Sequence, residues 1–228
     1  MILIYTHKIT PRLRYVFKHV FTRILLIPVK FTTTIEEFIA HSGLKMTYSK
    51  APLGKEFFIR SNDLLFEQGV NDLDINIFNY EEVPCFFNTG SNSVLPFDIF
   101  AASFFLLSRY EEYLPHVRDV HERFTAEQSL AFKYRFLEKP VIDIWAYKLL
   151  EKLKEKFPDY AYKDRAYKYI STIDVDNALQ APFFFVRLRR FSISTRKSAS
   201  VGPQKVPDIF WVFFGAILVG DSILSGYN

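Results

Sequence analysis

Two aspartates late in the chain, Asp174 and Asp176, have the residue type and spacing of a catalytic pair. They follow residues 169–173, a short run of apolar and β-branched residues that is typical of a strand. Because side chains on a strand alternate between its faces, both carboxylates project to the same side if the strand includes them. If the strand ends near Asp174, both lie at its carboxyl-terminal end, where open α/β sheets and α/β barrels carry their chemistry. Two such carboxylates can act as a general base and a metal ligand, and the alternative is a strand end with solvated aspartates.

Other residues that could do chemistry give weaker signals. His116 and His121 lie in the polar stretch 115–124, but a spacing of five misaligns them on a helix, and we expect a surface loop rather than a metal site. His7 and Lys8 follow the first predicted strand, where a phosphate-binding loop would need glycines that this stretch lacks. We therefore expect both to be ordinary loop residues.

Cys85 is the only cysteine, which excludes an intrachain disulfide framework and any site built from several cysteines. We expect it to be buried in a strand over residues 83–87 rather than to act as a nucleophile, because no nearby residue can serve as its base. A single cysteine suits a reducing compartment. Residues 1–5 are too short, and lack the basic leader, for a secretory signal, so we predict a cytoplasmic location.

The charge of the chain changes at about Ala178. Of its 29 basic and 25 acidic residues, six and two lie in residues 179–228, which leaves 23 of each in residues 1–178. The larger part is therefore neutral, which argues against nucleic acid as a partner. Residues 179–228 contain no Glu and no His, and their apolar run 209–220 is shorter than the ~18 residues that cross a membrane. We expect a poorly ordered tail and no membrane contact through it.

The first elements predict a parallel sheet. Residues 2–5 and 29–33 indicate two strands, and Thr10 and Pro11 mark the start of a helix between them, as its N-cap and its first helical residue. Apolar residues then recur at helical spacing up to Ile24. Strand, amphipathic helix and strand make the pattern of a βαβ unit, and the sequence therefore predicts an α/β fold.

The later elements extend this fold. Residues 45–49 and 56–60 are predicted as the two strands of a hairpin, because turn-forming residues separate them. Residues 97–114 are predicted as one continuous helix whose apolar first half is buried in the core. A last helix begins at Pro140, and the charged, tyrosine-rich stretch 159–167 is predicted to be a linker.

Four stretches carry a resemblance to a known family. They are DIFAASFFLLSRYEEY at 98–113, HERF at 121–124, FLEKP at 136–140 and STIDVD at 171–176. Through them, residues 1–178 resemble the N-terminal part of bacterial polysaccharide-deacetylase-like proteins of the kind found in Bacteroidetes. The last stretch resembles the first motif of the NodB-like deacetylase barrel, in its Asp-x-Asp variant.

The resemblance implies metal-assisted hydrolysis of an N-acetyl group on a glycan, with Asp174 as catalytic base and Asp176 as a ligand of a divalent metal, usually zinc. In that family two histidines of a later His-x-x-x-His motif complete the metal site. Here no histidine follows His121, and 52 residues follow Asp176, whereas a complete α/β barrel needs ~200 or more. We therefore expect this chain by itself to bind no metal and to be inactive, and we expect residues 179–228 to be the product of a frameshift or a truncated gene.

The sequence thus predicts three segments. Residues 1–165 are an N-terminal α/β accessory domain, three-layer-like and with a mostly parallel sheet. Residues 166–178 begin a deacetylase-like (β/α) barrel, and residues 179–228 are the tail. The expected partner is an N-acetylated carbohydrate, and the alternative is a non-catalytic α/β module that binds carbohydrate or a protein.

Overall fold

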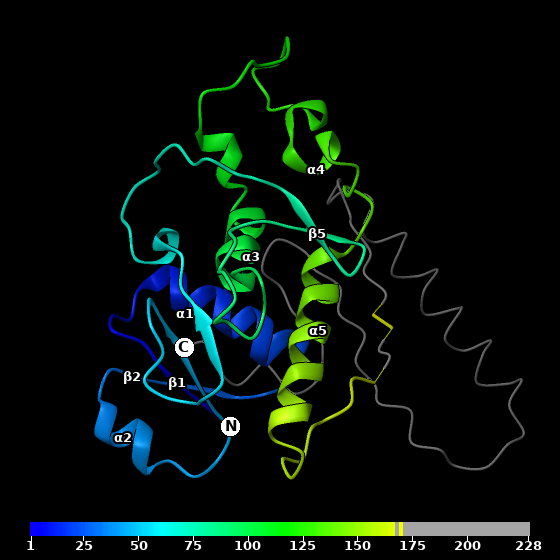
Figure 1. The fold of residues 1–228 in the computed structure, drawn as a ribbon. Coiled ribbons are helices and arrows are strands. Elements are labelled where there is room, and N and C mark those ends of the chain that lie inside the picture. The colour runs from blue at the N-terminus through cyan, green and yellow to red at the C-terminus, as the bar shows by residue number, and fades with distance from the viewer. Residues whose placement is uncertain (167–168, 171–228) are drawn as a thin grey trace, which may run out of the picture. The chain divides into compact units, whose positions relative to one another are not determined.

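The computed structural model describes residues 1–166 and 169–170, and residues Met1–Arg165 form one compact unit (Figure 1). Asp174 and Asp176, residues 171–173 of the predicted strand before them and the tail 179–228 lie outside the described residues. Among the described residues, no helix is both long and apolar enough to cross a membrane.

The centre of the unit is a four-stranded sheet in the order β2-β1-β3-β4. Its strands are β1 (Ile2–Tyr5), β2 (Val29–Thr32), β3 (Lys45–Ser49) and β4 (Phe58–Arg60), and every pairing between neighbours is parallel. Helices connect and cover these strands, so the protein has an α/β fold with a mostly parallel sheet, as the sequence predicts.

The helix between β1 and β2 begins as the sequence predicts. The Thr10 hydroxyl accepts a hydrogen bond from the Leu13 backbone N–H at 3.1 Å, and Pro11 is the first residue of α1 (Pro11–Phe17). The helix continues as a π-helix, η1 (Lys18–Ile24). Its predicted apolar stripe is buried throughout, and comprises Leu13, Val16, Phe17, Val20, Phe21 and Ile24.

The predicted hairpin of β3 and β4 is wrong, because the two strands are parallel, with Thr47 opposite Phe58 and Ser49 opposite Arg60. Parallel neighbours usually need a crossover of a dozen residues or more. Here only three residues pair, about 10 Å of strand, whereas residues 50–57 can span about 26 Å when extended. The connection is therefore long enough to return to the start of β3, and the carboxyl ends of β3 and β4 lie at the same edge of the sheet.

The two faces of the sheet are covered by different helices. The main core packs on the face that carries Ile4, Met46 and Tyr48. Over this core, α1 packs on α3 (Ile99–Leu107), and α5 (Val141–Lys156) packs on η1 and α3 (Figure 1).

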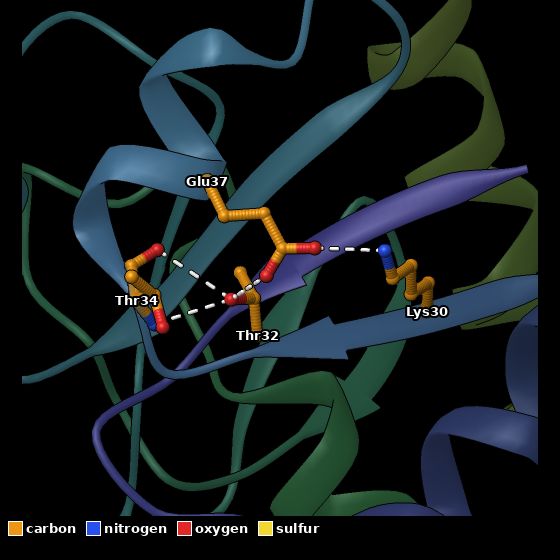
Figure 2. A network of polar contacts seen from close by, with 4 residues as sticks. All are labelled: Lys30, Thr32, Thr34 and Glu37. Atoms are coloured by element: carbon orange, nitrogen blue, oxygen red, sulfur yellow. Dashed lines mark hydrogen bonds and ion pairs between the residues drawn. The ribbon is translucent and has the colours of Figure 1, made fainter.

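The opposite face of the sheet carries α2 (Ile35–Ala40), which contacts β1 and β2. Buried Phe38 of this helix lies with its ring centroid 5.8 Å from that of Tyr5. Figure 2 shows how polar contacts fasten the start of α2 to the edge strand. Glu37 accepts hydrogen bonds from Lys30 Nζ at 2.7 Å and from the Thr32 hydroxyl, which in turn accepts from the Thr34 backbone N–H at 3.1 Å.

Two further strands, β5 (Phe78–Tyr80) and β6 (Val83–Cys85), form a separate antiparallel hairpin. Both residues of its turn, Glu81 and Glu82, have positive φ, as a type I′ turn requires. Cys85 is fully buried in β6, which confirms the sequence prediction, and burial raises the pKa of its thiol to about 12. Trp145 of α5 donates a hydrogen bond from Nε1 to the Pro84 carbonyl at 3.1 Å and so fixes the hairpin to the core.

The predicted helix 97–114 is interrupted. Its apolar first half is buried, as expected, but α3 ends at Leu107, and Arg109 has a left-handed backbone with a φ of 52°. A short 3₁₀ helix, η3 (Tyr110–Tyr113), follows, and Arg109 pairs with Glu112. The break turns the Tyr110 ring into the core, where its hydroxyl accepts a hydrogen bond from the Asn71 backbone N–H at 2.8 Å.

The remaining elements are short: η2 (Asp63–Leu65), η4 (Ala126–Gln128) and α4 (Leu130–Lys133). In contrast, α5 runs for 16 residues from Val141, directly after Pro140, and confirms the last predicted helix. Its buried face is formed by Val141, Trp145, Ala146, Leu149 and Leu153.

Candidate ligand-binding pocket

The residues that the sequence singled out for chemistry do not form a site within the described part of the chain. Asp174 and Asp176 lie outside it. Residues 1–166 and 169–170 contain no group of three or more His, Cys, Asp or Glu side chains that could hold a metal ion. In the loop 115–124, Asp119 instead accepts hydrogen bonds from the backbone N–H groups of His121 and Arg123 and pairs with the Arg123 guanidinium, so these groups order the loop itself.

A polar cavity of about 180 Å³ opens at the carboxyl ends of β3 and β4. We call it the strand-end pocket, and it is lined by Lys50, residues 60–62, residues 87–89 and Asp98. In open parallel sheets the carboxyl ends of the strands are where ligands bind, because the loops that follow the strands converge there. The pocket therefore lies where this fold class carries function.

Each wall of the pocket comes from a different part of the sequence. Lys50 directly follows β3, and residues 60–62 are the end of β4 and its continuation. Residues 87–89 follow the β5–β6 hairpin and form a loop that returns to α3, closed by a hydrogen bond from the Thr89 hydroxyl to the Leu95 carbonyl at 2.7 Å. This loop is fastened to β4, because the Val94 backbone N–H donates to the Phe58 carbonyl at 2.9 Å.

Asp98 forms the floor of the pocket and joins three elements. It is the N-cap of α3, where Oδ1 accepts hydrogen bonds from the backbone N–H groups of Phe100 at 3.0 Å and Ala101 at 3.1 Å. Its Oδ2 accepts from the Tyr48 hydroxyl at 2.6 Å and from the Asn62 backbone N–H at 2.7 Å. Burial raises the pKa of Asp98 to about 6, although these four donors act in the opposite direction. The same burial, together with the Asp98 charge, raises the pKa of Tyr48 well above its ordinary value.

The two amide side chains of the pocket are both held by their oxygens. Asn62 Oδ1 accepts from the Leu64 backbone N–H at 3.0 Å, and Asn88 Oδ1 accepts from the Gly90 backbone N–H at 2.7 Å. A backbone N–H can only donate, so these bonds fix which end of each amide is the oxygen. Within the described part of the chain, the NH₂ groups of both residues have no hydrogen-bond partner.

Ser61 is the most unusual residue of the pocket. Its side chain is buried, and among the described residues its hydroxyl has no hydrogen-bond partner. A buried hydroxyl without a partner costs roughly 1–3 kcal/mol in proteins, so such groups are rare without a reason. Ser61 is also one of the residues that line the pocket.

The lining also includes two cationic residues, Lys50 and Arg60, and the aromatic residue Phe87. Lys50 pairs with Asp63 at 2.6 Å, with both side chains more than half exposed, and the exposed Arg60 pairs with no carboxylate of the described residues. Phe87 has a φ of 63°, a left-handed conformation that is unfavourable for an aromatic residue and that clusters at ligand sites in other proteins.

The pocket has the chemistry of a binding site rather than of a catalytic one. Among its described lining residues there is no histidine and no cysteine. Its one carboxylate, Asp98, already accepts four hydrogen bonds, and Ser61 has no neighbouring base bonded to it. The arrangement can hold and orient a polar ligand, but it offers no activated nucleophile.

Sequence reasoning did not single out these residues. The signal was present, because polar residues directly follow both strands, as Lys50 after β3 and Arg60, Ser61 and Asn62 at the end of β4. The predicted hairpin obscured this signal, because antiparallel strands would have put Lys50 and residues 60–62 at opposite ends of the sheet.

Fold and pocket together define an α/β domain with a polar cavity at the carboxyl edge of a parallel sheet. The chain belongs to a family of unknown function (DUF7033), which matches residues 2–158. This range includes the whole sheet, α5 and every residue of the strand-end pocket. No curated protein and no solved structure matches the chain.

Proposed function

We propose that residues 1–165 form a non-catalytic domain that binds carbohydrate in the strand-end pocket. The observation that carries the proposal is the lining of the pocket, which is mainly polar and includes Arg60, Ser61, Asn62 and Asn88. Several convergent polar groups are what a polyhydroxylated ring needs, because its hydroxyls require hydrogen-bond partners.

The size of the pocket limits the ligand. Drug-sized molecules occupy cavities of roughly 300–1,000 Å³. A cavity of about 180 Å³ is smaller, and therefore fits a single sugar residue or the end of a longer glycan. The rest of such a glycan would extend into solvent.

The resemblance to polysaccharide-deacetylase-like proteins supports carbohydrate as the ligand. In this proposal residues 1–165 are the accessory domain, residues 166–178 begin the barrel, Asp174 is the catalytic base of the lineage and Asp176 its metal ligand. The residues of this chain do not fit a zinc ion, because Asp176 is one carboxylate where a catalytic site needs about three protein ligands, and no histidine follows His121. The proposal is therefore that this chain binds glycan and does not deacetylate it.

Titration of the full chain with an N-acetylglucosamine oligomer tests the binding proposal. Amide NMR spectra of the isotope-labelled protein should show shifts at Ser61, Asn62 and Asn88. Arg118, which lies in the loop 115–124 outside the pocket, offers a control, since Arg118→Met should leave these shifts unchanged. Shifts spread evenly over the domain, or none at all with any glycan, would contradict the proposal.

A second experiment addresses the deacetylase lineage. The purified chain should contain no stoichiometric zinc and should release no acetate from the same oligomer, with or without added zinc. Robust acetate release that is lost in Asp174→Asn would show instead that the chain is an active hydrolase.

A further inference from the structure

We infer that the strand-end pocket selects an oxyanion, the carboxylate or phosphate group of an acidic saccharide, over the hydroxyls of a neutral sugar. The inference rests on the proposed carbohydrate function and names the class of ligand. It follows from the balance of hydrogen-bond donors and acceptors in the pocket.

The amide side chains contribute donors only. The oxygens of Asn62 and Asn88 are both occupied by backbone N–H groups, of Leu64 and Gly90 respectively. Each residue therefore offers its two amide N–H bonds and, at most, a second lone pair on an oxygen already in use. A ligand that meets these side chains must supply acceptors.

The acceptors of the pocket are largely occupied. Asp98 is fully buried, and its two oxygens accept four hydrogen bonds from Tyr48, Asn62, Phe100 and Ala101. With every strong bonding direction used, this carboxylate does not offer itself to a ligand hydroxyl.

The charged groups of the rim are donors as well. Arg60 presents a planar guanidinium, whose fork matches a carboxylate or a phosphate in two parallel hydrogen bonds. Lys50 adds a second cation, partly engaged by Asp63. Because Asp63 pairs with Lys50, Arg60 is the cation of the lining that pairs with no carboxylate of the described residues.

Ser61 provides the independent sign that a ligand belongs here. Its hydroxyl is buried, has no partner among the described residues, and belongs to a residue that lines the same pocket as Arg60. An oxyanion bound by Arg60 offers acceptor lone pairs, and the Ser61 O–H is the neighbouring donor that lacks an acceptor.

The test compares four small probes on the isotope-labelled full chain: glucuronate, glucose 6-phosphate, inorganic phosphate and neutral glucose. We expect at least one acidic probe to bind with amide shifts at Ser61, Asn62 and Asn88. Glucose should bind at least about tenfold more weakly, because hydrogen bonds to charged groups are roughly twice as strong as neutral ones. Binding of the acidic probe should weaken as the salt concentration rises, whereas that of glucose should not.

Two variants locate the site. Arg60→Met keeps the apolar stem and removes the fork, and should weaken the acidic probe by about tenfold or more, whereas glucose, which loses only neutral hydrogen bonds, should weaken by much less. Ser61→Ala should also weaken the acidic probe, yet it should not lower the melting temperature of the free protein, because the hydroxyl has no partner to lose. Arg118→Met removes a positive charge outside the pocket and should change neither affinity.

The outcomes separate this inference from the proposed function. Equal affinities for glucose and for both acidic saccharides, or an Arg60→Met variant that binds the acidic probe normally, overturn the inference and leave carbohydrate binding intact. Binding of inorganic phosphate at Ser61 and Asn88 with no saccharide bound supports an anion site and overturns the carbohydrate function. The absence of binding by every probe overturns both.

Discussion

Asp98 is the residue on which the pocket and the core both depend, and the substitution Asp98→Asn tests its role. An amide has one oxygen where the carboxylate has two. If that oxygen serves the N-terminus of α3, the NH₂ group faces the Tyr48 hydroxyl and the Asn62 backbone N–H. The hydroxyl can rotate and become an acceptor, but the backbone N–H cannot.

The expected cost of Asp98→Asn follows from this orphaned donor. A buried N–H without a partner costs about 1–3 kcal/mol, and this is the destabilisation that we predict near pH 7. The pKa of Asp98 adds a dependence on pH. Burial raises it from 3.8 to about 6, so the native state holds the proton more tightly than the unfolded state. The stabilisation of the native state by protonated Asp98 is fully present below pH 3.8 and is lost as the pH rises through about 6.

One pKa unit corresponds to about 1.4 kcal/mol, so the raised pKa of Asp98 changes the free energy of unfolding of the wild type by about 3 kcal/mol over this pH range. Asparagine does not titrate. The stability difference between wild type and Asp98→Asn should therefore be largest at about pH 4 and should shrink as the pH rises to about 7.

Urea unfolding at several pH values, followed by circular dichroism, measures this difference. Tyr48→Phe is the matched variant, because it removes one donor and keeps the carboxylate. It should retain the pH dependence and move it to higher pH, since the Tyr48 hydrogen bond lowers the pKa of Asp98. A stability difference for Asp98→Asn that is the same at every pH would refute the raised pKa. No destabilisation at any pH would refute the structural role.

The remaining predictions concern the core and the edge of the sheet. Cys85 should react with a thiol-specific disulfide reagent only on unfolding, because it is buried and its pKa is raised to about 12; rapid labelling of the native protein would contradict this. Trp145→Phe should cost about 2–4 kcal/mol in urea unfolding, through a cavity and the lost bond to Pro84, and a cost below about 1 kcal/mol would contradict that packing. Glu37→Gln should lower the melting temperature near pH 7, because hydrogen bonds from Lys30 and then Thr32 lower the pKa of Glu37. The stabilisation by ionised Glu37 is present above pH 4.5 and is lost as the pH falls. A melting-temperature difference between wild type and Glu37→Gln that grows in acid would therefore contradict this prediction.

The local part of the fold was predictable from the sequence. The Thr10 cap, the proline after it and the apolar stripe of α1 are signals between near neighbours, and all are confirmed. The parallel class of the sheet followed from the strand, helix and strand at its start. The buried position of Cys85 followed from residue type.

The errors arose where distant residues decide the structure. Residues 50–57 contain good turn formers, but the direction of β4 is set by pairing with β3 and by the loop from residue 88 that docks on it. The predicted helix 97–114 has continuous helical propensity, but it breaks at Arg109, where Tyr110 enters the core and contacts Asn71. Neither contact leaves a local signal in the sequence.

The pocket was missed for the same reason. Its walls at residues 50, 60–62, 87–89 and 98 meet only once β3 and β4 are parallel and α3 begins beside them. The sequence instead drew attention to Asp174 and Asp176, which carry a strong local pattern and lie outside the described residues. Their roles as catalytic base and metal ligand remain predictions.

We infer that the strand-end pocket binds the oxyanion of a saccharide, and a single titration series can test this. Glucuronate and glucose 6-phosphate are added to the isotope-labelled wild type and to Arg60→Met, and the amide signals of Ser61 and Asn88 are followed. We expect saturable shifts at both residues in the wild type with at least one of the two probes. The affinity of Arg60→Met for that probe should be reduced by about tenfold or more. Titrations that leave Ser61 and Asn88 unmoved in the wild type, or that are the same in both proteins, would contradict it.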